Sequence, residues 1–282
     1  MSRYQTGTKK SFGQNFLIDK SVPEQIAYES ISYHKSKNQG KSAALEIGPG
    51  IGCLTYELAQ EYDRVVAVEI DSTLIPILGE TLQEFDNVKV INEDFLKLDL
   101  DEFFKNELDG YTVSVCANLP YYITTPIIMA LLERARGYLT SITVMVQKEV
   151  ATRLCAEPKN TDYGAITASI AYYGRAKKLF DVSPNCFLPA PKVTSSVVRI
   201  ELYDKIPYEP KSEKMLFKVI QGAFSQRRKT LLNSLSSYFP QVSKDKLSAI
   251  ITDCGFDINI RGERLSIDDF VRLSNEILKE HG

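Results

Sequence analysis

The sequence predicts an α/β fold, in which a doubly wound parallel sheet is followed by a small all-helical C-terminal domain. Two observations support this prediction. Short apolar runs rich in β-branched residues alternate with helical patterns over the first two thirds of the chain, which is typical of βαβ units. Beyond the proline-containing linker 206–210, only helical patterns remain. We therefore expect a sheet domain at 1–205 and a helical domain at 206–282.

The expected elements follow from apolar periodicity and from helix start and stop residues. After a polar segment, 1–19, the first helix is expected to begin near Ser21 and to reach about His34. Strands are expected at 43–47, 65–70, 88–92, 111–117 and 142–146, and helices at 54–60, 72–85, 124–136 and 148–155. Segments 165–180 and 193–203 are rich in β-formers and should add strands at one end of the sheet. Four helices are expected in the second domain, at 212–225, 227–238, 243–254 and 266–280.

Composition narrows the class of protein. With 282 residues, of which 44% are hydrophobic, the chain can bury a substantial core. No apolar run is long enough to cross a membrane, and the polar, basic start of the chain shows no signal peptide, so we expect a cytoplasmic protein. Five scattered cysteines without a Cys-x-x-Cys motif suit a reducing compartment, and with only two histidines no metal site is expected.

Charge is distributed unevenly along the chain. The net charge of −2 predicts no nucleic acid partner by itself. Between Lys214 and Lys244, however, there are six lysines and arginines and no acidic residue. A nearly neutral protein with such a basic segment can bind phosphates on one side. A solvated helix face is the alternative interpretation.

A glycine-rich turn, Gly48-x-Gly50-x-Gly52, follows the first expected strand and opens a helix. Many such turns are only tight strand-to-helix connections. Here Glu69 ends the next strand, about 20 residues further on, where nucleotide-binding folds place an acid for the ribose hydroxyls. The turn and the acid together favour a nucleotide-like ligand.

Two further acids shift the expected ligand away from a dinucleotide. Glu46 precedes the first glycine, where it would repel a pyrophosphate and attract the ammonium group of an amino acid. Asp94 ends the third strand and is placed to accept a hydrogen bond from an adenine amine. S-adenosylmethionine combines ribose, adenine and a cationic amino acid without any phosphate, so it is the favoured cofactor. Solvated acids at strand ends are the alternative.

The run Asn118-Leu119-Pro120-Tyr121 ends the fourth expected strand. Pro120 lacks an N–H group and holds Leu119 in extended geometry, so the chain cannot enter a helix smoothly there. The Asn118 amide oxygen and the Leu119 carbonyl can accept both protons of an exocyclic amine, and Tyr121 can stack on the base that carries it. Alternatively, the segment is a proline turn whose asparagine caps the next helix.

These motifs resemble the S-adenosylmethionine-dependent rRNA adenine N6-dimethyltransferase family. The matching runs are Lys10–Leu17, Leu45–Gly52, Val68–Asp71, Glu93–Phe95, Asn118–Tyr121 and Phe187–Thr194. The resemblance implies a Rossmann-like methyltransferase domain that releases S-adenosylhomocysteine. It implies a cofactor site of Asn15, Leu17, Gly48, Glu69, Asp94 and Asn118. It also implies an adenine site of Asn118, Leu119, Pro120, Tyr121 and Phe187. Tyr122 stands where many relatives carry asparagine.

The C-terminal runs Ala223–Leu235 and Arg264–Phe270 resemble the small-subunit branch of the family rather than the resistance methylases. This resemblance implies that Arg227, Arg228 and Lys229 hold rRNA phosphates. It also implies that two adjacent adenosines near the 3′ end of small-subunit rRNA are dimethylated, in a late assembly particle and by a monomer.

Other functions remain open from the sequence. A large-subunit methylase of the macrolide-resistance type and a non-catalytic RNA-binding assembly factor would share this fold. A pyrimidine C5 methylase would need a cysteine nucleophile, and neither Cys116 nor Cys186 follows a proline. A small-molecule amine methylase would not explain the basic helical segment.

Overall fold

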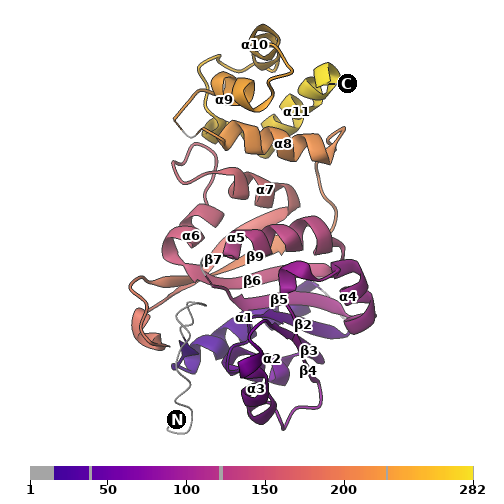
Figure 1. Ribbon diagram of the computed structural model, residues 1–282, viewed down its shortest axis with the longest axis vertical. Coiled ribbons are helices and arrows are strands. Elements are labelled where there is room, and N and C mark those ends of the chain that lie inside the picture. The colour runs from indigo at the N-terminus through magenta and orange to yellow at the C-terminus, as the bar shows by residue number, and fades with distance from the viewer. Residues whose placement is uncertain (1–15, 38–39, 121–122, 227, 282) are drawn as a thin grey trace. The chain divides into compact units, whose positions relative to one another are not determined.

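The computed structural model describes residues 16–37, 40–120, 123–226 and 228–281 (Figure 1). The chain forms two compact units. The first comprises Met1–Ala151 and Lys177–Leu202, and the second comprises Thr152–Ala176 and Tyr203–Gly282. Residues 152–176 thus group with the C-terminal helices, whereas the sequence suggested a single boundary at 205. In the part of the chain that the structure describes, no helix is long and apolar enough to span a membrane.

The first unit is built on a seven-stranded mixed sheet with the strand order β4-β3-β2-β5-β6-β9-β7 (Figure 1). Its strands are β2 (Ser42–Ile47), β3 (Arg64–Glu69), β4 (Val88–Asn92), β5 (Thr112–Asn118), β6 (Leu139–Gln147), β7 (Gly174–Val182) and β9 (Ser195–Leu202). Strands β2 to β6 are parallel, and β9 runs antiparallel to β6. The predicted α/β class and all five predicted parallel strands are confirmed. Strand β2 is buried along its whole length, which explains its apolar run Ala43–Leu45.

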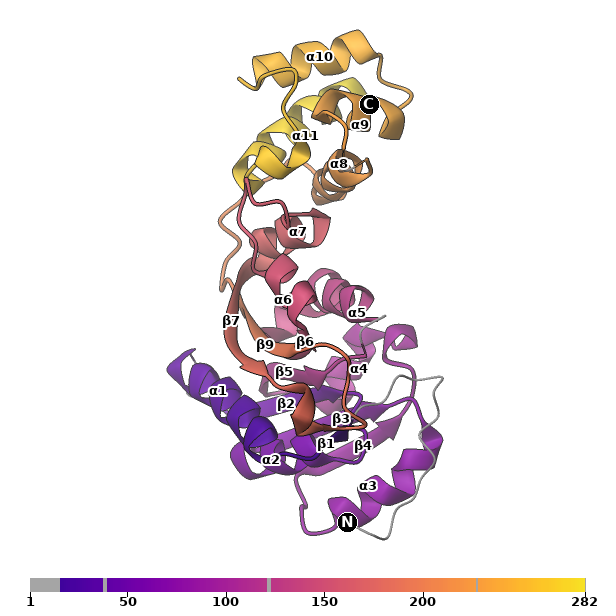
Figure 2. The ribbon, with the colours of Figure 1, turned by 90° about the vertical axis from the view of Figure 1, so that its left-hand side faces the viewer.

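Helices cover both faces of this sheet. They are α1 (Ser21–Lys37), α2 (Cys53–Glu61), α3 (Ile75–Thr81), α4 (Leu100–Glu107), α5 (Thr124–Ala130) and α6 (Lys148–Leu154). Figure 2 shows α1 and α2 on one face and α4 and α5 on the other. The helix predicted at 72–85 begins instead with a 3₁₀ turn, Ser72–Leu74, because the Asp71 side chain caps the amide of Thr73. The doubly wound arrangement leaves the carboxyl ends of the strands open for a ligand.

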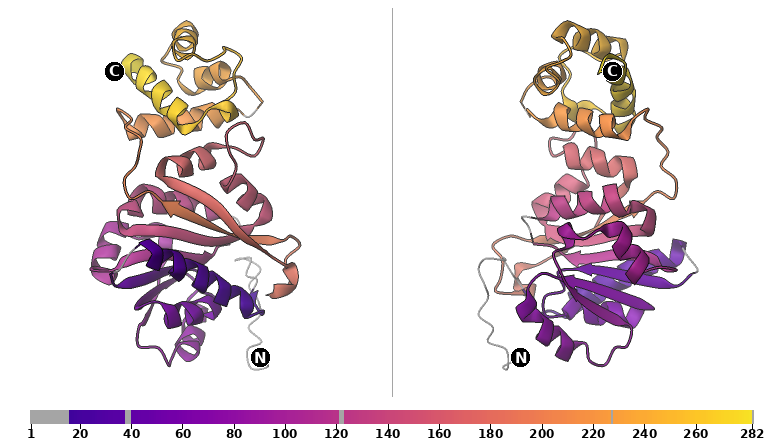
Figure 3. Two further views of the ribbon diagram at one scale, coloured as in Figure 1. Left: turned by 180° about the vertical axis from the view of Figure 1, so that it is seen from behind. Right: turned by 45° about the vertical axis from the view of Figure 1, so that its right-hand side comes forward.

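A buried polar network fixes α1 on the central strands, across which it runs in Figure 3. His34 Nδ1 lies 3.0 Å from Ser114 Oγ, and its Nε2 lies 2.9 Å from Thr112 Oγ1. Ser30 Oγ lies 2.7 Å from the Tyr62 hydroxyl. Burial lowers the pKa of His34, so the ring is neutral near pH 7 and can both donate and accept. This histidine therefore has a structural role.

One predicted strand is wrong in part. Residues 165–180 were expected to be strand, but Ala165–Tyr173 forms helix α7, and strand β7 begins only at Gly174. Nearly every side chain of α7 is buried, so the helix has no polar face and its apolar run resembles that of a strand. The helix begins where Thr167 Oγ1 accepts the Gly164 N–H at 3.3 Å, a start pattern that the β-former count did not weigh.

The second unit contains α7 together with α8 (Glu213–Phe224), α9 (Leu231–Tyr238), α10 (Lys244–Asp253) and α11 (Ile267–His281). The four predicted C-terminal helices are confirmed. Helix α9 begins at Leu231 rather than at 227, because the Thr230 side chain accepts the Asn233 N–H at 3.4 Å and caps the helix there. Arg228 and Lys229 consequently lie just before α9 and not on it.

Candidate active site

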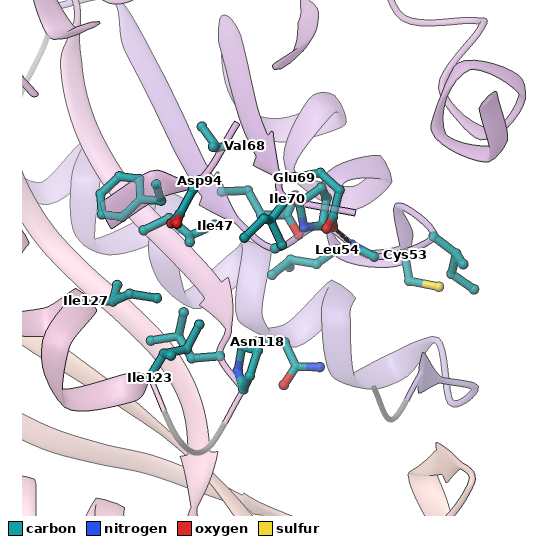
Figure 4. A pocket seen from close by; sticks show the side chains of 18 of the residues that line it. Ile47, Cys53, Leu54, Val68, Glu69, Ile70, Asp94, Asn118, Ile123 and Ile127 are labelled. Atoms are coloured by element: carbon teal, nitrogen blue, oxygen red, sulfur yellow. Dashed lines mark hydrogen bonds between the residues drawn. The ribbon is translucent and has the colours of Figure 1, made fainter. Parts of the chain in front are cut away.

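A cavity of about 330 Å³ opens at the carboxyl ends of β2, β3, β4 and β5 in the first unit (Figure 4). This volume falls in the range of small-molecule binding sites. The segments that follow these four strands line the cavity, as do Leu17 and Phe187 from elsewhere in the chain. They contribute Glu46–Ile51, Cys53, Leu54, Val68–Ile70, Glu93–Leu96, Asn118–Pro120, Ile123 and Ile127.

The glycine turn forms one wall of the cavity. Gly48, Gly50 and Gly52 have φ angles of 72°, 62° and 90°, a left-handed conformation that other residues adopt at a cost. At Gly52 a Cβ atom would also lie 3.1 Å from Leu78 Cδ2. The turn therefore requires glycine, and Gly48 and Gly50 line the cavity.

Glu69 ends β3 with its side chain only 3% exposed. Its Oε2 accepts the Gly50 N–H at 3.1 Å, and its Oε1 accepts the Asp71 N–H at 2.8 Å (Figure 4). Burial raises the pKa of Glu69, and these two hydrogen bonds oppose the rise. The Ile70 N–H also acts on the carboxylate, which still keeps acceptor capacity for a ligand hydroxyl. Glu69 thus also braces the glycine turn, which the sequence did not predict.

Glu46 is the most unusual group in the cavity. Its side chain is 1% exposed, and its Oε2 has no hydrogen-bond partner among the residues that the structure describes. Burial raises its pKa to about 8; the neighbouring Thr55 hydroxyl opposes this rise, and the nearby Glu69 carboxylate adds to it. An unpartnered buried oxygen is costly, and a ligand cation would satisfy it. This orphaned oxygen is the observation that fits a cofactor with an ammonium group.

Asp94 lies at the end of β4 on the opposite side of the cavity from Asn118 (Figure 4). Its Oδ1 accepts the Leu96 N–H at 3.1 Å, which caps a short 3₁₀ turn, and its Oδ2 lies 3.5 Å from Lys97 Nζ. The carboxylate is thereby oriented by its own turn and still lines the cavity. It can accept a further hydrogen bond from a ligand amine.

Asn118 is the last residue of β5, and the chain leaves the strand there. The Leu119 N–H donates to the Met145 carbonyl at 3.3 Å, and the Pro120 carbonyl accepts the Thr124 hydroxyl at 3.2 Å. Within the described ranges, no donor reaches the Leu119 carbonyl, and no hydrogen bond joins the Asn118 amide to α5. The alternative of a helix-capping asparagine therefore finds no support, and two acceptors remain available at the cavity.

A two-stranded ribbon adds the last wall of the cavity. Strand β1 (Phe16–Leu17) pairs antiparallel with β8 (Phe187–Leu188), and Leu17 lies opposite Phe187. Both residues are buried and line the cavity. The Cys53 thiol lies 3.6 Å from the Leu17 carbonyl. The sequence predicted both cavity residues separately, but it did not predict their pairing or the place of Cys53.

The structure therefore brings together most of the predicted site residues. Leu17, Gly48, Glu69, Asp94, Asn118, Leu119, Pro120 and Phe187 all line one cavity. Asn15, Tyr121, Tyr122 and Arg227 lie outside the described residues, so their roles stay predictions. Arg228 and Lys229 are exposed in the second unit. Among the residues with described positions, no group of three or more metal-ligating side chains is placed to hold a metal ion.

The sheet, the glycine turn and the acids at successive strand ends define a class: the chain is a Rossmann-like methyltransferase that uses S-adenosylmethionine. The model of the ribosomal RNA adenine dimethylase family matches residues 6–279. The chain belongs to this family, and its substrate is ribosomal RNA.

Two curated relatives span nearly the whole chain. The "Ribosomal RNA small subunit methyltransferase A" of Lachnoclostridium phytofermentans is 45% identical over 280 residues, which cover 98% of this chain and 94% of the relative. The protein of the same name from Bacillus cytotoxicus is 45% identical over 285 residues, with 99% and 94% covered.

Two solved structures share the fold. A dimethyladenosine transferase from Plasmodium falciparum superposes with a TM-score of 0.75 at 23% identity, covering 94% of this chain and 98% of that one. The 23S rRNA methyltransferase ErmE superposes with a TM-score of 0.67 at 23% identity, covering 93% and 99%. At this level of identity, both comparisons concern the fold alone.

Proposed function

We propose that the chain dimethylates the N6 atoms of two adjacent adenosines in the 3′-terminal hairpin loop of small-subunit rRNA. It would act in the cytoplasm, as a monomer, on an assembling ribosomal particle. The observation that carries the proposal is the pair of available acceptors, the Asn118 amide and the Leu119 carbonyl, at the edge of a cavity whose lining includes the acids Glu46, Glu69 and Asp94. The names of the relatives above support the choice of the small subunit.

The cofactor would be held by the acids at the strand ends. The remaining lone pairs of Glu69 suit the ribose hydroxyls, the orphaned oxygen of Glu46 suits the ammonium group, and Asp94 suits the adenine amine. Leu17 would contact the cofactor from the apolar side of the cavity, and the backbone of Gly48 would contact it from the glycine turn. When bound, S-adenosylmethionine supplies a methyl group on a positively charged sulfur.

The target amine is a weak nucleophile, because its lone pair is delocalised into the adenine ring. Asn118 Oδ1 and the Leu119 carbonyl would accept its two hydrogens, orient the nitrogen towards the methyl donor and stabilise the positive charge that develops on it. No strong base is required, since the nitrogen becomes acidic once methylated. The product of the first transfer still carries one hydrogen, so a second transfer is chemically possible after the cofactor is exchanged.

The target base must leave its stack to reach these acceptors. Phe187 would stack on one face of the splayed adenine and Tyr121 on the other. The paired strands β1 and β8 hold Phe187 at the cavity. In the second unit, Arg227, Arg228 and Lys229 would hold rRNA phosphates, which position the RNA without reading its sequence.

The direct test uses labelled S-adenosylmethionine with unmodified small and large ribosomal subunits, followed by mapping of the methylated nucleosides. We expect N6,N6-dimethyladenosine at two adjacent positions near the small-subunit 3′ end. Label confined to the large subunit would refute the proposal in favour of a resistance-type methylase, and absence of label would favour a non-catalytic assembly factor.

The Asn118→Ala variant tests the mechanism in the same assay. At saturating RNA and cofactor we expect about a hundredfold slower methyl transfer, the size of effect seen when one oriented polar group is removed. Affinity for RNA should hardly change, because phosphates over a wide surface supply most of it. A near-normal single-turnover rate would show that this strand end is only a structural turn.

A further inference from the structure

Two lysines converge on one carboxylate at an edge of the sheet in the first unit. Lys148 Nζ lies 3.1 Å from Asp181 Oδ2, and Lys178 Nζ lies 3.3 Å from Asp181 Oδ1. The Ser196 hydroxyl donates to Asp181 Oδ1 at 2.6 Å. Two ammonium groups and one carboxylate leave this cluster with a net positive charge. The side chains of both lysines are about half exposed, at 55% and 46%.

The cluster lies at the same edge of the sheet as the catalytic cavity. Lys148 directly follows β6, whose neighbour β5 carries Asn118. In the strand order β5-β6-β9-β7, Asp181 on β7 is three strand spacings from β5, or about 14 Å. Both ends of this span lie on the first unit, so a single RNA strand can cross from one to the other.

The cluster also anchors the loop that carries Phe187. Strand β7 leads from Asp181 into this loop, which returns to β9 after Thr194 (Figure 2). The Lys148 N–H donates to the Thr194 carbonyl at 3.0 Å. Within the loop, Leu188 is 64% exposed and Val193 is 43% exposed. The loop that leads from the cluster to Phe187 therefore exposes two apolar side chains.

The two exposed ion pairs between the lysines and Asp181 add little to the stability of the fold. Ion pairs between exposed side chains contribute little, because water screens them. The hydrogen bond from Ser196, followed by that from Lys148, holds the pKa of Asp181 at about 2, so its carboxylate is ionised throughout the neutral range. The carboxylate presents two oxygens to several donors, which is also how a phosphate group would bind between two lysines.

We propose that Lys148 and Lys178 form a binding site for a phosphate of the rRNA strand that flanks the target adenosine. In the free enzyme Asp181 holds the two ammonium groups in place, and the arriving phosphate competes with it for them. This inference rests on the proposed rRNA substrate, and it adds a phosphate site in the first unit to the basic segment of the second.

The competition between Asp181 and the phosphate predicts effects of opposite sign. Replacing both lysines with glutamine should weaken binding of an unmodified 3′-terminal fragment of small-subunit rRNA by about threefold to tenfold, as expected for two exposed charge contacts. The slope of log affinity against log salt concentration should become shallower, because about one to two fewer counterions are released on binding. Asp181→Asn removes a negative charge from the site, so it should tighten RNA binding by about twofold to fivefold.

Matched control variants distinguish the loss of this phosphate site from a general effect of the protein's net charge on RNA binding. Lys35→Gln/Lys89→Gln changes the same net charge at two exposed lysines, each paired with one glutamate, elsewhere on the first unit. RNA affinity of this control should stay within twofold of the wild type. Lys148→Arg/Lys178→Arg keeps both charges and should bind like the wild type, while thermal unfolding verifies that every variant is folded.

Two results would show that Lys148 and Lys178 do not bind an rRNA phosphate. Equal losses in Lys148→Gln/Lys178→Gln and in the control would overturn the phosphate site, as would unchanged or weaker binding by folded Asp181→Asn. If Asp181→Asn does not fold, the lysine variants and their salt dependence alone decide. Methyl transfer by the wild type to the same RNA checks the proposed function separately, since it can succeed whether or not the lysine variants bind more weakly.

Discussion

Glu46 offers the sharpest test of the site, because its carboxyl group is buried with one oxygen unpartnered. We expect Glu46→Gln to change how the stability of the free protein depends on pH. The pKa of Glu46 rises from 4.5 to about 8 on folding, chiefly through burial. Between these two pKa values, the folded state holds a proton that the unfolded state has lost. The free energy of unfolding therefore falls as pH rises from 4.5 to 8.

The size of this effect follows from the pKa change. At 1.36 kcal/mol per unit, the rise corresponds to at most about 5 kcal/mol, and about 2–4 kcal/mol remains if the surroundings relax around the charge. Glutamine has nearly the same shape and does not titrate, so Glu46→Gln should lack this part of the pH dependence. Urea unfolding of both proteins at pH 5 and pH 8.5 measures the difference. Glu61→Gln, at an exposed position of α2, serves as the control.

Cofactor binding should make the ionised form of Glu46 favourable. An ammonium group beside the carboxyl favours the ionised form, so binding near pH 7 should release a proton from the wild type and none from Glu46→Gln. Titration calorimetry in two buffers of different ionisation enthalpy measures that proton. We also expect Glu46→Gln to weaken S-adenosylmethionine binding by about 1–3 kcal/mol. The same pH dependence in both proteins, together with unchanged cofactor affinity, would refute this account of Glu46.

Three further predictions test the remaining residues. Glu69→Ala should weaken S-adenosylmethionine binding by about 1–3 kcal/mol and loosen the glycine turn; calorimetry showing full affinity would remove it from the site. Phe187→Ala should weaken capture of the splayed adenine by about 1–3 kcal/mol while cofactor affinity is kept, and an unchanged KM for RNA would contradict this. Changing Arg227, Arg228 and Lys229 to glutamine should flatten the salt dependence of RNA binding without affecting the cofactor; unchanged salt dependence would leave them a solvated surface.

The sequence predicted the parallel sheet and the ends of its strands well, because both depend on local patterns. A buried parallel strand such as β2 is mostly apolar, and the acids at the ends of such strands mark the open edge. The same criterion failed at Ala165–Tyr173, since a helix buried on nearly all sides is also mostly apolar. Periodicity distinguishes helix from strand only where one face remains polar.

Contacts between distant segments were beyond the sequence. The pairing of Leu17 with Phe187 joins residues from opposite ends of the sheet domain, and no local pattern encodes it. The contact of Lys148 with Asp181 is similar, because β9 lies between β6, which leads to Lys148, and β7, which carries Asp181. Such contacts depend on the order of the strands within the sheet. The order of the elements along the chain does not determine that strand order.

The ribbon formed by β1 and β8 connects the proposed cofactor site, at Leu17, with the proposed adenine site, at Phe187. Each strand is only two residues long, and so short a ribbon has little stability in water by itself. Leu17 and Phe187, which are buried against the cavity wall, stabilise it, as does the hydrogen bond from the Ile18 N–H to the Cys186 carbonyl at 2.9 Å. A ligand that fills the cavity beside Leu17 adds contacts on one strand and thereby steadies Phe187 on the other. By reciprocity, a base stacked on Phe187 favours the cofactor-bound ribbon to the same extent. In the proposed reaction, the cofactor and the target base would therefore meet in a site that each of them helps to complete.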